Sequence, residues 1–91
     1  MERNVEKEME AIVNLPNVSG CILTDKSGLS LGVKGNASGN SAGLIAAIAN
    51  QAAQLDPELD PPIISLQNNS RQCIIHQSGP VIGAIFKDTS Q

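Results

Sequence analysis

The residues whose side chains could do chemistry are few in this sequence and lie far apart. His76 is the only histidine of the chain. If it lies in a strand, the alternation of side chains places it on the face opposite Cys73 and Ile75. No serine or cysteine beside it forms a recognisable nucleophile motif. We therefore interpret His76 as an ordinary histidine of a strand.

Two cysteines, Cys21 and Cys73, are each embedded in an apolar run. Small secreted domains usually carry several disulfides, whereas two distant cysteines are typical of buried, reduced thiols in an intracellular protein. A metal site would need more histidines and cysteines at ligand spacing. Asp56, Glu58 and Asp60 flank prolines, which is more typical of a solvated acidic loop than of an acid/base pair. The sequence therefore predicts no metal site.

A glycine-rich stretch with one lysine, residues 28–35, is the remaining candidate for a ligand site. A phosphate-binding P-loop has the order G-x-x-x-x-G-K-[ST] and joins a strand to a helix. This stretch lacks that order and lies inside a predicted hairpin. The sequence thus predicts no catalytic residue, no cofactor and no metal, and we expect a protein that is not an enzyme.

The composition predicts one domain, residues 1–91, with a modest margin of stability. The chain has one phenylalanine and neither tryptophan nor tyrosine, so its core is expected to be aliphatic. A chain this short buries only about 60–65% of its unfolded surface, which makes help from a partner plausible. The net charge of −3 and the lack of aromatic platforms predict no binding of nucleic acid.

No segment has the pattern of a signal peptide or a membrane anchor. The N-terminal residues are charged, Glu2 rules out N-myristoylation, and residues 88–91 hold no cysteine for prenylation. The long uncharged stretch over residues 35–55 is too polar to span a bilayer. We expect no direct membrane insertion, so any membrane association would come through a partner.

The spacing of apolar residues predicts two helices and five strands in the order α-β-β-α-β-β-β. The predicted helices span residues 4–14 and 40–55, and the predicted strands span residues 18–25, 29–34, 63–67, 72–77 and 81–87. This order predicts an α/β (α+β) fold with a five-stranded antiparallel sheet. We expect both helices to cover one face of that sheet.

The second predicted helix has more apolar surface than one contact needs. On a helical wheel, Leu44, Ile48 and Leu55 cluster on one side, and a row of alanines occupies the adjoining side. The apolar arc is about 200° wide, against about 100° for a helix that packs on one side only. We expect the leucine side to pack on the chain's own sheet. The alanine side would then be covered by a partner or, alternatively, by the first helix and the loops.

The predicted strand over residues 63–67 supports a partner as well. It is short and uncharged, so at a sheet edge it would lack the lysine or inward charge that discourages edge pairing. The alternative is a central position in the sheet. We predict that this strand and the alanine side of the helix contact a partner. The predicted interface residues are Ala42, Ala46, Ala49, Ala53, Ile63, Ile64, Ser65, Leu66 and Gln67.

The chain resembles the roadblock/longin-like family in the order of its elements and in five sequence passages. These passages are LPNVSG (15–20), TDKSGLSLG (24–32), AGLI (42–45), NQAAQL (50–55), and II (74–75) with AIFK (84–87). Within that family the chain is similar to the roadblock-type subunits of the Ragulator complex. The likeness covers nearly the whole chain, and it depends on the order and spacing of the passages.

The resemblance implies a function that composition does not show. It implies a non-catalytic scaffold subunit that forms a heterodimer with another roadblock-type subunit. A lipid-anchored scaffold subunit would hold it, as a cytoplasmic protein, at the surface of the late endosome or lysosome. Such a complex recruits Rag GTPases and supports TORC1 activation by amino acids, and the family is also linked to apoptosis control and to a viral X protein.

Two other classes of function remain as alternatives. One is a homodimeric roadblock module that serves another small GTPase or a dynein motor, which predicts a stable homodimer. The other is a small-ligand sensor or enzyme of profilin-like shape, which predicts a pocket with convergent polar groups.

Overall fold

The computed structural model describes residues 5–89, so the predicted helix start at residue 4 and the terminal residues 1–3, 90 and 91 lie outside it. The helices are α1 (Val5–Val13) and α2 (Ala42–Ala53), the latter preceded by a short 3₁₀ turn, η1 (Gly39–Ser41). The strands are β1 (Val18–Asp25), β2 (Ser30–Gly35), β3 (Ile64–Gln67), β4 (Arg71–Ser78) and β5 (Val81–Asp88). The predicted order of elements is confirmed.

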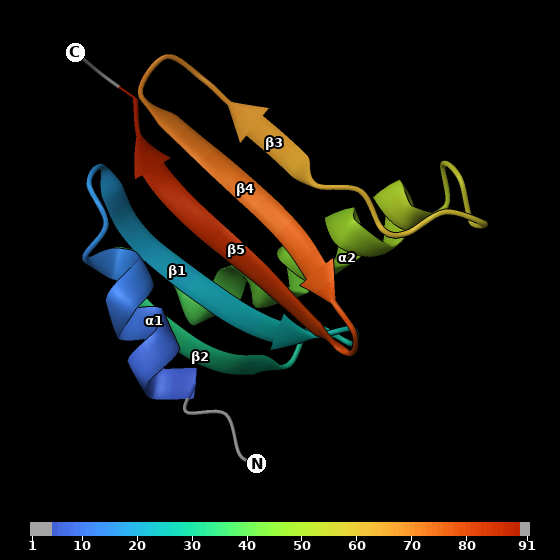
Figure 1. Ribbon diagram of the computed structural model, residues 1–91, viewed down its shortest axis with the longest axis horizontal. Helices are drawn as coiled ribbons and strands as arrows, with labels where there is room; N and C mark the ends of the chain where they lie inside the picture. The colour runs from blue at the N-terminus through green and yellow to red at the C-terminus, as the bar shows by residue number, and fades with distance from the viewer. Residues whose placement is uncertain (1–4, 90–91) are drawn as a thin grey trace.

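The five strands form one antiparallel sheet in the order β2-β1-β5-β4-β3 (Figure 1). The turn between β1 and β2 is held by Asp25, whose Oδ1 accepts hydrogen bonds from the backbone N–H groups of Ser27 and Leu29, both at 2.9 Å. Gly28 has φ of 95° in this turn, a conformation that favours glycine. β3 lies at an edge of the sheet, so the alternative of a central position for this strand is wrong.

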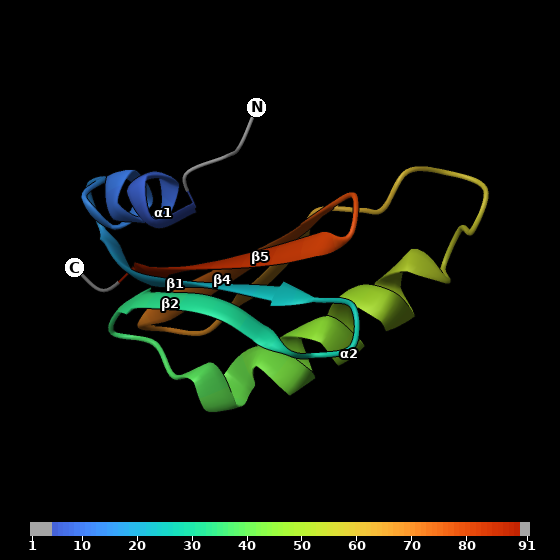
Figure 2. The ribbon, with the colours of Figure 1, turned by 90° about the horizontal axis from the view of Figure 1, so that it is seen from below.

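The two helices lie on opposite faces of the sheet (Figure 2). α1 packs on β1 and β2, whereas α2 packs on β1, β4 and β5. The prediction that both helices cover one face is therefore wrong. The reason lies in β1, where Cys21 and Ile22 point to opposite faces and both are buried. A strand that is apolar on both sides needs cover on both faces.

The main core lies between α2 and the sheet. It is built from Ile22, Ala42, Ile45, Ala46, Ala49, Ile75, Ile82 and Ala84. All of these side chains are aliphatic, as the composition predicted. Since alanine adds little bulk to the helix surface, α2 can lie close to the sheet while isoleucines fill the space between them.

Among the side chains of α1 that the structure describes, residues 6–13, that of Met9 is deeply buried and attaches the helix to its face of the sheet. A Cβ placed on Gly32 would come within 2.9 Å of the Met9 sulfur, so the thioether occupies the space that this glycine leaves open. The Cys21 thiol donates a long hydrogen bond, 3.8 Å, to the Met9 carbonyl. The Lys34 ammonium forms an ion pair with the Glu6 carboxylate at 2.6 Å. α1 thus covers the β1–β2 half of its face.

Candidate partner-binding surfaces

The part of the chain that the structure describes offers little for catalysis. Among residues 5–89, no group of three histidine, cysteine or acidic side chains is placed to hold a metal ion. His76 lies on the face that carries α1, opposite Cys73 and Ile75, as predicted. Both cysteines are free thiols, and burial raises the pKa of Cys21 and of Cys73. A raised pKa keeps a thiol protonated and makes it a poor nucleophile.

The alanine side of α2 faces inward. Ala42, Ala46 and Ala49 are only 1%, 2% and 3% exposed and belong to the core against the chain's own sheet. Ala53, at the end of the helix, is half-buried. The predicted partner interface is therefore wrong for the first three alanines, because the chain itself covers them. Their small size, which suggested a close contact with a partner helix, serves a close contact with the sheet.

The outward side of α2 carries the larger apolar side chains. Leu44 is 66% exposed, Ile48 is half-buried on the same side, and Leu55, two residues beyond the end of the helix, is 86% exposed. We expected this side to pack on the sheet, which is wrong for Leu44 and Leu55, whereas Ile48 does pack against the core. A helical wheel shows how wide an apolar arc is, but it does not show which part of the arc turns toward the sheet.

β3 is an open edge, and its residues Ile64 and Leu66 lie on the same face of the sheet as α2, beside Ile75 and Cys73 of β4. It pairs with β4 on one side only. Leu66 is 45% exposed, and Ile63, just before the strand, is 68% exposed. The predicted interface residues Ile63, Ile64, Ser65, Leu66 and Gln67 thus lie together at this edge, and their contact with a partner stays a prediction. We call Leu44, Ile48, Leu55 and residues 63–67 the pairing surface.

A groove of about 530 Å³ lies on the opposite face of the sheet, beside α1. Met9 and Ile12 of α1 form one side, and Ile74 and Ile85 lie among the apolar residues of the strands that line it. His76 is among its few polar residues. We call this the α1 groove. Nothing in the sequence pattern predicts it, because it exists only through the position of α1 over one half of the face.

No helix within residues 5–89 has the length and apolar character that crossing a bilayer requires. Two surfaces of the described elements are left uncovered, the pairing surface and the α1 groove, and they lie on opposite faces of the sheet.

Solved structures of roadblock proteins share this architecture. A Roadblock/LC7 domain from Streptomyces avermitilis superposes with a TM-score of 0.80 at 15% identity, covering 94% of this chain and 79% of that one. Myxococcus xanthus MglB superposes with a TM-score of 0.76 at 18% identity, covering 98% and 76% of the two chains. The chain therefore has the roadblock fold.

Sequence comparison narrows the class to one family. Residues 1–87 match the family of the Ragulator complex protein LAMTOR5. LAMTOR5 of Xenopus tropicalis is 34% identical over 92 residues, covering 99% of this chain and all of that protein. A LAMTOR5 homolog of Nematostella vectensis is 31% identical over 88 residues, covering 96% and 97%. The chain belongs to the LAMTOR5 family of Ragulator subunits.

Proposed function

We propose that this chain is a non-catalytic scaffold subunit of a Ragulator-type complex, which recruits Rag GTPases to the lysosome and supports amino-acid-dependent activation of TORC1. Membership of the LAMTOR5 family supports this proposal, and we extend it to a correspondence with the hepatitis B virus X-interacting protein. The observation that carries it is the pairing surface, which combines leucines that are 66% and 86% exposed with an open sheet edge. Apolar surface of this kind marks a contact with another protein.

Another roadblock-type subunit is the proposed partner at the pairing surface. An edge strand of that subunit would add to β3 and satisfy its unpaired backbone groups. A helix of the same subunit would cover Leu44, Ile48 and Leu55. Pairing of this kind continues the sheet from one subunit to the other and keeps both covering helices on one face.

The lipid-anchored scaffold subunit is the proposed partner at the α1 groove. The groove and the pairing surface lie on opposite faces of the sheet, so both can be occupied in one complex. The apolar strand residues of the groove, Ile74 and Ile85, would take the apolar side of a bound segment. That subunit would place the chain at the surface of the late endosome or lysosome.

A replacement experiment in cells tests the proposal. In cells that lack their own copy of this subunit, the wild-type chain is expected to restore Rag GTPases on lysosomes and TORC1 activity after amino-acid addition. Leu66→Lys should lose both, because a charge on the edge strand blocks strand addition. Lys26→Glu, an exposed change in the β1–β2 turn, serves as the control and should restore both. If removal of the subunit leaves Rag localisation unchanged, the proposal is wrong.

A further inference from the structure

β2 forms the second open edge of the sheet, on the side away from β3. It pairs with β1 on one side only, and no strand among residues 5–89 lies along its other side. In Figure 1, β2 is the outermost strand next to β1. Ser30, Leu31 and Gly35 of this strand are exposed. The backbone N–H and C=O groups on the outer side of β2 therefore have no strand partner, and we call residues 30–35 the β2 edge.

The charged side chain of β2 does not protect this edge. A lysine that extends from an edge strand discourages pairing with another chain. The Lys34 ammonium instead contacts α1, where it lies 2.6 Å from a carboxylate oxygen of Glu6 and 3.9 Å from one of Glu10. The Lys34 side chain is only 28% exposed. The outer side of β2 thus remains accessible to an added strand.

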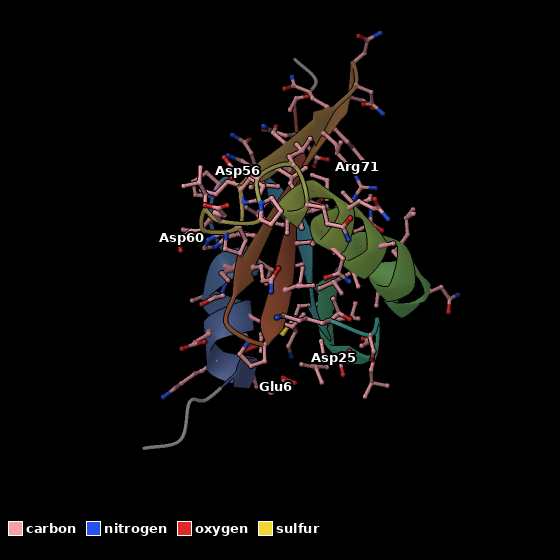
Figure 3. All side chains as sticks on the ribbon, turned by 90° about the vertical axis from the view of Figure 1, so that its right-hand side faces the viewer. Glu6, Asp25, Asp56, Asp60 and Arg71 are labelled. Atoms are coloured by element: carbon pink, nitrogen blue, oxygen red, sulfur yellow. The ribbon has the colours of Figure 1, made fainter. Side chains whose placement is uncertain are left out.

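Charge beside the β2 edge indicates the chemistry of a partner. The side chains of Glu6 and Glu10 are 75% and 66% exposed, and their two carboxylates share the ammonium of Lys34. The three side chains together thus keep a net negative charge. Figure 3 shows Glu6 on α1, on the side of the sheet away from α2. A segment that lies along β2 would place a basic side chain favourably on that side.

Apolar surface lies near the other end of the same strand. Leu31 is 49% exposed and lines the α1 groove, and Leu29, just before the strand, is 63% exposed. On the face that carries α1, β2 therefore offers an apolar contact near its start and an acidic contact near its end. The matching segment has apolar side chains and a basic side chain at alternate positions, because alternate positions share one face of a strand.

A second copy of this chain fits the β2 edge poorly. Two β2 strands paired about a two-fold axis perpendicular to the sheet would keep both α1 helices on one face. The exposed glutamates of the two helices would then lie close together, and like charges placed together disfavour association. A partner segment with a basic side chain meets the same carboxylates favourably.

We propose that the β2 edge binds an extended segment of a partner protein. The segment adds an antiparallel strand to the sheet, with a basic side chain at Glu6 and Glu10 and apolar side chains at Leu31. Backbone hydrogen bonds hold the segment, and the two side-chain contacts select its sequence. The inference goes beyond the proposed function, because β2 and β3 are at opposite edges of the sheet. A complex that is joined through β3 leaves β2 free.

A synthetic peptide tests this binding in the full chain by NMR titration. The peptide is six residues long, as β2 is, with threonine at every second position and a lysine followed by two valines at the others. Antiparallel pairing then sets the lysine beside Glu10 and the valines beside Leu31. Binding is expected to saturate, and the amide signals that move should belong to β2 and to the adjoining residues of α1. A peptide that fails to bind would overturn the inference.

N-methylation of the peptide distinguishes strand addition from other kinds of binding. The residues of an added strand point their backbone N–H groups alternately toward β2 and away from it. Methyl groups on the nitrogens that point toward β2 should weaken binding about tenfold or more, since several hydrogen bonds are lost. Methyl groups on the other nitrogens should leave binding unchanged. Equal affinity of peptides methylated at odd and at even positions would show that no strand is added.

Substitutions in the chain test the two side-chain contacts. Leu31→Lys places a charge on the open edge and should weaken binding of the peptide about tenfold or more. Glu10→Lys removes the acidic contact and should weaken it about two- to fivefold. Asp60→Lys makes the same charge change in the segment before β3, away from β2, and should leave the affinity unchanged. Equal weakening by Glu10→Lys and Asp60→Lys would contradict the contact at α1.

Leu66→Lys separates the β2 edge from the pairing surface. It changes β3 alone, so the peptide should still bind at β2 with wild-type affinity. If the peptide instead moves the signals of β3 and Leu66→Lys abolishes its binding, the inference is wrong while the pairing surface stands. If sedimentation shows self-association of the chain that Leu31→Lys prevents, a second copy occupies the β2 edge and the inference is also wrong.

Discussion

The inward and outward sides of α2 reverse the usual relation between the size of an apolar side chain and its burial. The inward side is mostly alanine, with Ala42, Ala46 and Ala49 buried, whereas Leu44 on the outward side and Leu55 just after the helix are exposed. Small side chains let the helix lie close to the sheet, so three alanines and Ile45 complete the core on this side. The larger side chains are left for a second contact. In a chain this small, side-chain size alone therefore does not tell the inside from the outside.

Single arginine substitutions on the two sides of α2 should show the largest difference in stability. Ala49→Arg buries an unpaired charge, which costs several kcal/mol of a total stability of about 5–15 kcal/mol. We expect the isolated variant to lose most of its cooperative thermal transition. Leu44→Arg adds the same side chain outward and should stay within about 0.5 kcal/mol of the wild type, while losing the partner. Equal destabilisation by both variants would contradict the assigned orientation of the helix.

Met9→Ala extends the comparison to the other face, where the buried Met9 side chain attaches α1 to the sheet. Removing a buried methionine side chain typically costs about 2–5 kcal/mol, and we expect the lower end because the α1 groove already opens beside it. Denaturant unfolding of the isolated chain measures this loss. Ile12→Ala, a half-buried position on the same helix, is the matched control and should cost less. An equal or larger cost at Ile12 would show that Met9 is not the main anchor.

The smallest effect is expected from the ion pair that also holds α1. The Glu6 carboxylate, by hydrogen bond and by charge, raises the pKa of Lys34 above its ordinary value of 10.5. Because the pKa is higher in the folded chain, the stabilisation is fully present below the ordinary value and is lost as pH rises through the raised one. Lys34→Gln should thus lower the melting temperature slightly at neutral pH. A difference that persists in strong alkali would contradict this origin.

Local signals explain why most of the fold could be predicted. The turns at Gly28 and Gly79, both with positive φ, separate strands whose apolar residues the sequence shows plainly. The structure places β3 at an edge of the sheet, where one side of its backbone is free to pair with another strand. The sequence could not decide this, because an uncharged strand can lie at an edge or in the centre of a sheet. The sequence also contained a signal that both faces of the sheet are covered by helices, because Cys21 and Ile22 are consecutive apolar residues in β1.

The binding surfaces could be predicted only in part, because they depend on how elements are oriented in space. The rotation of α2 about its axis decides whether Leu44 or Ala46 meets the sheet, and both choices satisfy the same helical wheel. The α1 groove depends on where Met9 anchors its helix. The Arg71 side chain extends across β5 and donates a hydrogen bond to Ser19. These residues are far apart in the sequence, so no local pattern predicts their contact.

The exposed leucines in and just after α2 and the open edge of β3 also bear on how a cell controls the amount of this subunit. A copy that leaves the ribosome without a partner displays Leu44, Leu55 and an unpaired strand, which are features that chaperones and proteases recognise in orphan subunits. Assembly hides both features at once. The lifetime of the chain is thus expected to follow the supply of its partner, so that surplus copies are cleared and the complex keeps its stoichiometry.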